Sequence, residues 1–164
     1  LNLTHLHNVL LKIIMCFFMN FIPKKKEAIN KLDYFIEKNL KDYSKLRNFD
    51  FGPDKREKTS CLSPYITHGV INELEIINKS LKKFSFVKNE KFILEVLWRI
   101  YWKGWLELRP TVWSEFLKEL QKLKRNFQEN KNYIDAINGK TNIECFNHWV
   151  EELKNFNYLH NHTR

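Results

Sequence analysis

Apolar residues recur at helical spacing along most of this chain, and that periodicity limits the fold more than any other feature. No segment shows the strict apolar–polar alternation that marks a half-buried strand. The 164 residues include only four glycines and four prolines, too few for a turn-rich β architecture. The sequence therefore predicts an all-α fold, a helical bundle without an internal repeat.

Helix breakers divide the predicted helices. The first begins at Pro23, and the second begins at Ser63, which we expect to cap it with Pro64 in the first turn. That helix should bend or restart near Gly69. A third helix begins at Asn89 and is ended by Pro110, and a fourth runs from Thr111 to Phe127. Shorter helices over 133–138, with Gly139 as the C-cap, and 143–156 complete the prediction.

The periodicity also predicts which side chains form the core. The helical spacing nominates these apolar positions: Ala28, Ile29, Leu32, Phe35, Ile36, Leu40, Ile93, Val96, Leu97, Ile100, Val112, Phe116, Leu120, Leu123, Ile143, Phe146, Trp149, Val150 and Leu153.

The first residues of the chain do not fit the rest. The chain starts at Leu1 rather than Met, and the apolar run over 9–18 is interrupted by Lys12. That run is short for a bilayer span, which needs about 20 residues. No small-residue cleavage site follows it. We expect residues 1–18 to be non-native upstream translation or a disordered leader, with Met19 as the true start; a short interfacial anchor is the alternative.

Charge and cysteine content indicate the kind of partner and the compartment. The formal net charge of +9 favours a polyanion, meaning nucleic acid, a phosphorylated cofactor or an acidic membrane. The cysteines Cys16, Cys61 and Cys145 are isolated, so neither a disulfide framework nor a zinc finger is predicted. A reducing cytoplasm is the expected location.

The third predicted helix carries a polar and aromatic arc. At 100° per residue, Glu95, Trp98, Arg99 and Trp102 share one side, opposite the predicted core positions. Such a face could hydrogen-bond to and stack on a flat polar ligand. Alternatively, the tryptophans pack on another helix while Glu95 and Arg99 form an i,i+4 ion pair.

Three hydroxyl residues, Thr59, Ser60 and Ser63, precede Pro64. A helix N-terminus presents unpaired N–H groups to phosphate oxygens, and hydroxyls can donate in addition. Plain capping by Ser63 is the alternative, although it leaves Thr59 and Ser60 unexplained. At the other end, His160 and His162 have metal-ligand character but no further ligand at suitable spacing, so no metal site is predicted. His68 and His148 are interpreted as ordinary helix residues.

Four segments in order resemble the photolyase/cryptochrome family, in particular its helical FAD-binding domain. They are "YSKLRNFD" (43–50), "TSCLSPYITHG" (59–69), "LEVLWRIYW" (94–102) and "NGKTNIECFNHWVEELKNFNYLHNHTR" (138–164). The loop "GPDKR" (52–56) and "YWKGWLELRP" (101–110) are most similar to a short bacterial branch that lacks the N-terminal antenna-binding domain. The resemblance implies that residues 19–164 correspond to the first half of the FAD-binding domain, a fragment expected to be inactive alone.

The resemblance also implies roles for particular residues. Glu95 and Trp98 would receive a flipped-out lesion, with Trp102 also contacting DNA, and Asn161 would join Glu95 and Trp98 as a catalytic residue beside the flavin. The implied FAD-binding set is Tyr43, Thr59, Ser60, Cys61, Leu62, Ser63, Arg99, Asn161 and Arg164. The chain departs from the family pattern at Cys61, Asn142, Asn147 and Tyr158, where arginine, glycine, aspartate and tryptophan are usual.

The implied function is FAD-dependent, light-driven splitting of cyclobutane pyrimidine dimers in damaged DNA. Such a protein would be a cytoplasmic monomer without a membrane partner. Two alternatives remain open at this point. One is a cryptochrome-like flavin photoreceptor without repair activity, and the other is a basic helical nucleic-acid-binding module without a cofactor.

Overall fold

The structure is a computed structural model that describes residues 21–164, and every regular element in that range is helical. The predicted all-α fold is therefore confirmed for this part of the chain. The expectations for residues 1–18 and for Met19 lie outside the described residues. The elements are α2 (Lys25–Lys38), η1 (Leu40–Asp42), α3 (Tyr43–Leu46), η2 (Arg56–Lys58), α4 (Ser63–Thr67), α5 (Glu73–Lys83), α6 (Phe86–Glu107), α7 (Pro110–Phe127), α8 (Lys131–Ile137) and α9 (Glu144–Phe156).

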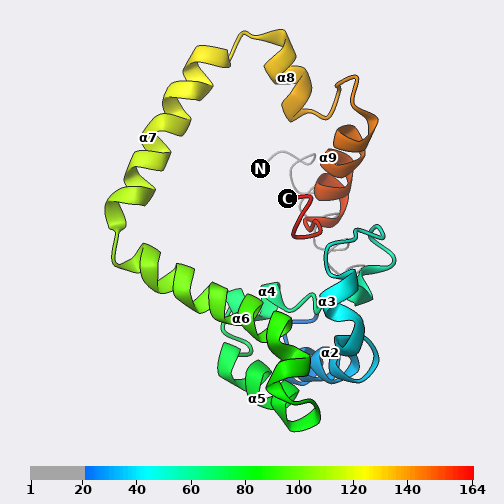
Figure 1. Cartoon of the computed structure of the whole chain (residues 1–164). Helices are drawn as coiled ribbons and strands as arrows, with labels where there is room; N and C mark the ends of the chain where they lie inside the picture. Colours follow the sequence, from blue (N-terminus) through cyan, green and yellow to red (C-terminus); the bar gives the residue numbers. More distant parts are fainter. Residues whose placement is uncertain (1–20) are drawn as a thin grey trace.

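One hydrophobic core joins α2, α4, α5 and the first half of α6 (Figure 1). Aromatic contacts lie at its centre, where the Phe92 ring is 5.1 Å from Phe35 and 5.4 Å from Tyr43 between centroids. Burying one such large apolar side chain contributes about 2 kcal/mol. The buried members are Ala28, Leu32, Phe35, Ile36, Leu40, Leu62, Tyr65, Ile71, Ile76, Phe92 and Val96.

The face that α6 turns to this core differs from the prediction. Phe92, Ile93 and Val96 are buried, whereas Leu97 and Ile100 are 41% and 40% exposed, so their assignment to the core is wrong. The buried stripe follows the i, i+3, i+4, i+7 spacing that starts at Asn89. Within residues 21–164, the buried side chains of α6 all lie on this stripe and in the first half of the helix.

Asn89 anchors the start of α6 to the end of α5. Its side chain is 1% exposed, and its Nδ2 donates to the carbonyl oxygens of Ser80 and Phe84, each at 3.0 Å. The Ser80 carbonyl also accepts the backbone N–H of Phe84, so Asn89 adds a second bond there, and it supplies a partner for the Phe84 carbonyl beyond the end of α5. A polar residue therefore fixes the turn between the two helices that pack most closely.

The start of α4 also differs from the prediction. Leu62 occupies the N-cap position and no side chain caps the helix, so the predicted cap at Ser63 is wrong. The predicted restart near Gly69 is confirmed, because α4 ends at Thr67 and Gly69 has a φ of +67°. The chain restarts at α5 through a capping box, in which Asn72 and Glu75 exchange hydrogen bonds.

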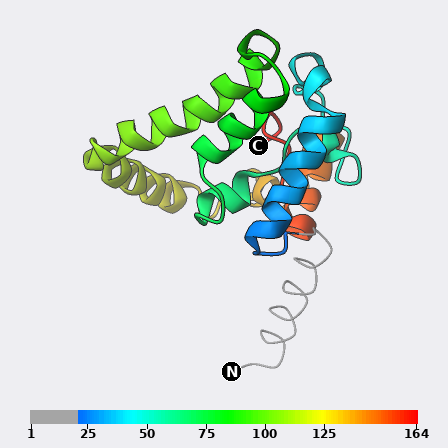
Figure 2. The ribbon, with the colours of Figure 1, turned by 90° about the horizontal axis from the view of Figure 1, so that it is seen from below.

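The second half of the chain follows an open course away from this core. In Figure 1, α7 continues outward from the end of α6, α8 turns back, and α9 brings the C-terminus to the loop before α4; Figure 2 shows the same return from below. Neither α7 nor α8 contains a buried residue, and Phe116 and Leu123 on α7 are 53% and 50% exposed. The apolar stripe predicted for α7 is real, but no described element packs on it.

Gly139 controls the turn from α8 to α9. It follows the C-cap Asn138, has a φ of +70°, and lets Lys140 donate to the carbonyl of Asp135 at 2.8 Å. A Cβ atom at this position would lie 2.9 Å from the Val150 side chain on α9. The prediction placed the C-cap of this helix at Gly139. The C-cap is Asn138, and Gly139 follows it in the positive-φ position that glycine favours.

The return of α9 is fixed by residues of the loop over 50–62. The Arg56 guanidinium forms an ion pair with Glu152 of α9 and lies 5.0 Å from the centroid of the Tyr158 ring. The Tyr158 ring also contacts Phe21, at 5.7 Å between centroids. The two ends of the described chain are thereby held together. None of the helices within residues 21–164 is both long enough and apolar enough to cross a membrane.

Candidate functional site

A cavity of about 720 Å³ lies between the second half of α6, the loop over 59–63 and the C-terminal residues. Its walls come from segments far apart in the sequence. All twelve site residues nominated from the sequence line it: Tyr43, Thr59, Ser60, Cys61, Leu62, Ser63, Glu95, Trp98, Arg99, Trp102, Asn161 and Arg164. The polar arc of α6 and the hydroxyl loop therefore face one shared space.

Arg47 and Glu95 form an ion pair in the cavity wall, in which Arg47 Nη1 donates to Glu95 Oε1. Burial, with Glu95 nearby, raises the pKa of Tyr43 to about 12, and the Arg47 guanidinium partly opposes this rise. The alternative pair between Glu95 and Arg99 does not form. Glu95 is instead oriented from α3, across the cavity wall, by a residue 48 positions earlier in the chain.

Arg99 lines the cavity and bridges α6 to the elements beside it. Its Nη2 donates to Thr67 Oγ1 at 2.6 Å, and its Nε lies 3.6 Å from Glu73 Oε1. The side chain is 36% exposed, so the guanidinium is reached from solvent. Arg99 is thus a positioned cation at the edge of the cavity and not a buried structural ion.

The tryptophans of α6 are not packed on another described helix, contrary to the second interpretation of this face. Trp98 and Trp102 are each 51% exposed, with their rings 6.3 Å apart at an interplanar angle of 24°. Their indoles therefore present accessible apolar surface beside the charged groups of the cavity.

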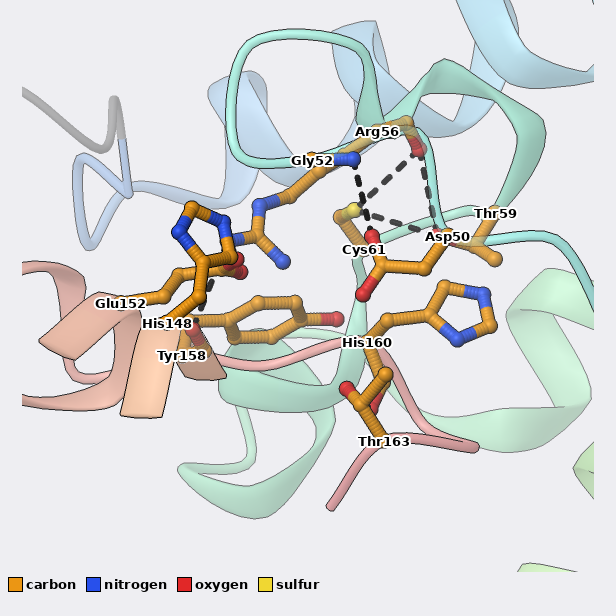
Figure 3. A network of polar contacts seen from close by, with 10 residues as sticks. All are labelled: Asp50, Gly52, Arg56, Thr59, Cys61, His148, Glu152, Tyr158, His160 and Thr163. Atoms are coloured by element: carbon orange, nitrogen blue, oxygen red, sulfur yellow. Dashed lines mark hydrogen bonds and ion pairs between the residues drawn. The ribbon is translucent and has the colours of Figure 1, made fainter. Parts of the chain in front are cut away.

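The loop that carries the hydroxyls has a reversed backbone at Cys61, whose φ is +49°. Such a conformation is uncommon for a residue with a side chain and costs on the order of 1 kcal/mol. Thr59 Oγ1 donates to the carbonyl oxygen of Arg56 at 3.1 Å and lies 3.4 Å from Cys61 Sγ (Figure 3). The buried Cys61 side chain and this hydrogen bond hold the loop in the shape that lines the cavity.

Residues after α9 form the remaining wall. Burial raises the pKa of Tyr158 to about 12; the Cys61 thiol adds to this rise, and a hydrogen bond with Ser63 opposes it. The Ser63 hydroxyl does not cap α4. At the end of the chain, Arg164 Nη2 donates to Asn161 Oδ1 at 3.0 Å, which orients both side chains.

Asn147 stands where aspartate is usual in the family that the chain resembles, and it organises the turn before α9. Its Oδ1 accepts from the Thr141 backbone N–H at 2.9 Å and from Thr141 Oγ1 at 2.8 Å. Its Nδ2 donates to the Thr141 carbonyl oxygen at 2.7 Å. The amide therefore makes a donor contact that an ionised aspartate could not make.

Several residues of the site were not assigned a role from the sequence. Two of them line the cavity and could have been nominated. Arg47 belongs to the segment "YSKLRNFD", and Lys103 lies one helical turn after Arg99. His160 lies behind the cavity wall and does not line it; it is 6% exposed, and its Nδ1 accepts the backbone N–H of His162 at 3.2 Å. Within residues 21–164, no three histidine, cysteine or acidic side chains come together to hold a metal ion.

Comparison with known proteins adds no assignment. No family model, no curated protein and no solved structure matches this chain.

Proposed function

We propose that the cavity binds FAD and that the protein acts in light-driven repair of cyclobutane pyrimidine dimers, as DNA photolyases do. The observation that carries this proposal is the convergence of all twelve nominated residues on one cavity. They come from four segments between Tyr43 and Arg164, and nothing in the helical periodicity of the sequence requires these segments to meet. A chance resemblance would have left some of them on unrelated surfaces.

The donor set of the cavity suits a dinucleotide with a pyrophosphate. Its volume falls within the range of roughly 300–1,000 Å³ that is usual for cofactor sites. Among the described residues that line it, four are cationic and one is a carboxylate, which Arg47 already pairs. The four cations are Arg47, Arg99, Lys103 and Arg164. The net positive charge and the hydroxyls complement phosphate oxygens, and the indoles suit a flat ring system.

Particular residues would hold each part of the cofactor. Ser60 and Arg99 would bind the pyrophosphate, and this role depends on the hydroxyl and the charge because α4 is only five residues long. Thr59 would shape the loop instead, because its hydroxyl proton is donated to the Arg56 carbonyl. Asn161 and Arg164, already joined by a hydrogen bond, would lie beside the flavin ring and favour its reduced, anionic form. The chemistry that the bound flavin supplies is donation of one electron to the dimer in light.

Glu95 and Trp98 would receive the lesion. Arg47 holds the Glu95 carboxylate in one orientation, so that its oxygen accepts hydrogen bonds from an extruded pyrimidine pair. The half-exposed face of Trp98 offers a surface on which that pair can stack. The two residues lie about one helical turn apart, so both contacts are on the same side of α6.

Flavin binding is the first test. The purified chain is titrated with FAD while flavin fluorescence and anisotropy are recorded, and saturable binding is expected. Arg164→Ala should weaken it, whereas Arg125→Ala, on the exposed face of α7, should not. Absence of saturable binding would refute the cofactor assignment and leave a cofactor-free nucleic-acid-binding module.

Repair is the second test. The resemblance implies that residues 19–164 are inactive alone, so the test uses the flavin-loaded protein extended to a complete FAD-binding domain. Oligonucleotides that carry a thymine dimer are incubated under blue light and in darkness, and the remaining dimers are quantified. Loss of dimers only in light is the expected result. A flavoprotein that undergoes photoreduction but leaves the dimers intact would instead be assigned to light signalling without repair.

A further inference from the structure

Four aromatic side chains form a continuous row along the second half of α6. We call it the aromatic ladder, and it consists of Trp98, Tyr101, Trp102 and Trp105. Neighbouring rings are in contact: centroid distances are 5.5 Å for Trp98–Tyr101, 5.3 Å for Tyr101–Trp102 and 5.7 Å for Trp102–Trp105. The row covers two turns of one helix, so it is rigid compared with aromatics on a loop.

The ladder extends beyond the cavity. Trp98 and Trp102 line the cavity, whereas Tyr101 and Trp105 do not. Tyr101 is 54% exposed, although large aromatic side chains usually find a packing partner in a folded protein. Neither the proposed flavin site nor the core therefore explains why this half of the helix carries four large aromatics.

Basic groups accompany the ladder. The Arg109 guanidinium lies 4.5 Å from the centroid of the Trp105 ring at one end, and the exposed Lys91 lies two turns before Trp98 on the same side. Lys103 flanks the row within the helix. Glu95, one turn before Trp98, is already paired with Arg47, and Glu107 lies on the opposite side of α6 from the row. The face is thus both aromatic and cationic.

We propose that the aromatic ladder binds single-stranded nucleic acid by stacking unpaired bases on its rings, with phosphates contacting the flanking cations. Aromatic side chains interleaved with cations are the general means of binding single strands without sequence preference. A duplex conceals its base faces within the stack, so it cannot use such a row. This inference goes beyond the proposed function, because it requires neither a lesion nor a bound flavin.

The test measures binding of the unmodified chain and its variants to a fluorescently labelled deoxythymidine oligomer of about 12 nucleotides, a length within the range for one stacking groove. Fluorescence anisotropy gives Kd, with the matching duplex as competitor. Trp105→Ala should raise Kd by roughly fivefold or more, the loss expected for one stacked base. Trp105→Phe should restore most of the affinity. Increasing salt should weaken binding through the phosphate contacts.

Trp113→Ala is the control, because Trp113 is a tryptophan on α7 outside the ladder; it is 63% exposed, whereas Trp105 is partly buried. Its Kd should equal that of the unmodified chain. Equal weakening by Trp105→Ala and Trp113→Ala would overturn the proposal, and so would equal affinity for the duplex. Binding to vesicles of anionic lipid that depends on Trp105, without binding to the oligomer, would assign the ladder to a membrane surface and overturn it as well.

The two proposals fail separately. Trp105 does not line the cavity, so Trp105→Ala should leave FAD binding unchanged. Oligomer binding without FAD binding would remove the flavin assignment and keep the ladder. FAD binding without oligomer binding would keep the flavin assignment and overturn the proposed role of the ladder. If a second copy of the chain covers the ladder, sedimentation will show a dimer that Trp105→Ala dissociates, and the proposal is then wrong.

Discussion

Arg56 and Glu152 form an ion pair that joins two segments 96 residues apart. Their side chains are 10% and 2% exposed, so the pair is almost fully removed from water. Arg56 also lies against the Tyr158 ring and donates to the Tyr158 carbonyl oxygen at 3.4 Å. Because Arg56 immediately precedes the hydroxyl loop, this pair fixes the C-terminal wall of the cavity relative to that loop (Figure 3).

Removing one member of this pair should destabilise the protein strongly. Glu152→Ala leaves a buried guanidinium whose Nε and Nη1 already have no hydrogen-bond partner. A broken buried pair typically costs about 3–5 kcal/mol, so the free energy of unfolding measured with urea should fall by that order. Glu151→Ala, at the exposed neighbouring position, is the control and should change it by less than about 0.5 kcal/mol. Similar small losses for both variants would show that the pair contributes little.

Stability should fall at alkaline pH because of Tyr43 and Tyr158. Both have a pKa raised to about 12, against 10.0 for the ordinary phenol. Between pH 10 and 12 the unfolded chain releases phenolic protons that the folded chain retains, so the free energy of unfolding decreases as pH rises. The slope is about 1.4 kcal/mol per pH unit for each tyrosine, and below pH 10 this contribution is fully present.

Urea unfolding between pH 9 and 12 checks this prediction. Tyr158→Phe should make the decline shallower by roughly the contribution of one tyrosine. Tyr34→Phe is the matched control, because Tyr34 is 54% exposed; it should leave the pH dependence of the free energy of unfolding unchanged. An unchanged slope in Tyr158→Phe would contradict the assignment.

Two glycine-to-alanine substitutions should act in opposite directions. Gly139→Ala meets Val150 at 2.9 Å and has a φ of +70°, so it should lower the free energy of unfolding by about 1–3 kcal/mol. Gly104→Ala lies inside α6, where an added Cβ meets nothing within 4 Å, so it should raise that free energy by about 1 kcal/mol. Thermal or urea unfolding of the two variants measures both changes. A change of the same sign in the free energy of unfolding for both variants would refute the steric and conformational argument.

Flavin retention should depend on Arg99 in a protein extended to the complete FAD-binding domain. Arg99→Ala removes a partly exposed cation from the cavity edge, so FAD bound after purification should decrease severalfold, consistent with loss of about 1–3 kcal/mol from a charge-assisted hydrogen bond. The absorbance ratio of flavin to protein measures this occupancy. Arg99 also contacts Thr67 and Glu73, so circular dichroism must confirm that the fold is retained. Unchanged occupancy would exclude a phosphate contact.

Lesion recognition should depend on Trp98. Trp98→Ala should weaken binding to a duplex with one thymine dimer by about 1–3 kcal/mol, through loss of stacking on the extruded bases. Binding to the undamaged duplex should change less, because its bases remain stacked. Competition titrations with the two duplexes measure both values. Equal losses on both would show that Trp98 makes only a general contact.

Local patterns were sufficient to predict the elements of the site. The arc with Glu95, Trp98 and Arg99 follows from the helical repeat, and the hydroxyls of Thr59 and Ser60 follow from their positions before Pro64. Spacing along one element is enough for such predictions, because it decides which side chains share a face. The meeting of both elements at one cavity depended on the resemblance, since no local rule brings residue 59 to residue 98.

Contacts between distant segments were not predictable in this way. The pairing of Glu95 with Arg47 instead of Arg99, and of Arg56 with Glu152, requires the relative position of α3, α6 and α9. The N-cap of α4 falls at Leu62 and not at Ser63, the residue that the local pattern favoured. For Glu95, a tertiary neighbour thus replaced the interaction that the local spacing offered.

The sequence by itself determined that this chain is helical and where its apolar and polar faces lie, because both depend on side chains within a few residues of one another. Only the tertiary structure decided which of those faces are buried. Similar apolar stripes are packed on α2 but exposed on α7. Burial requires a second surface, and the position of that surface is a property of the whole chain and not of the helix that carries the stripe.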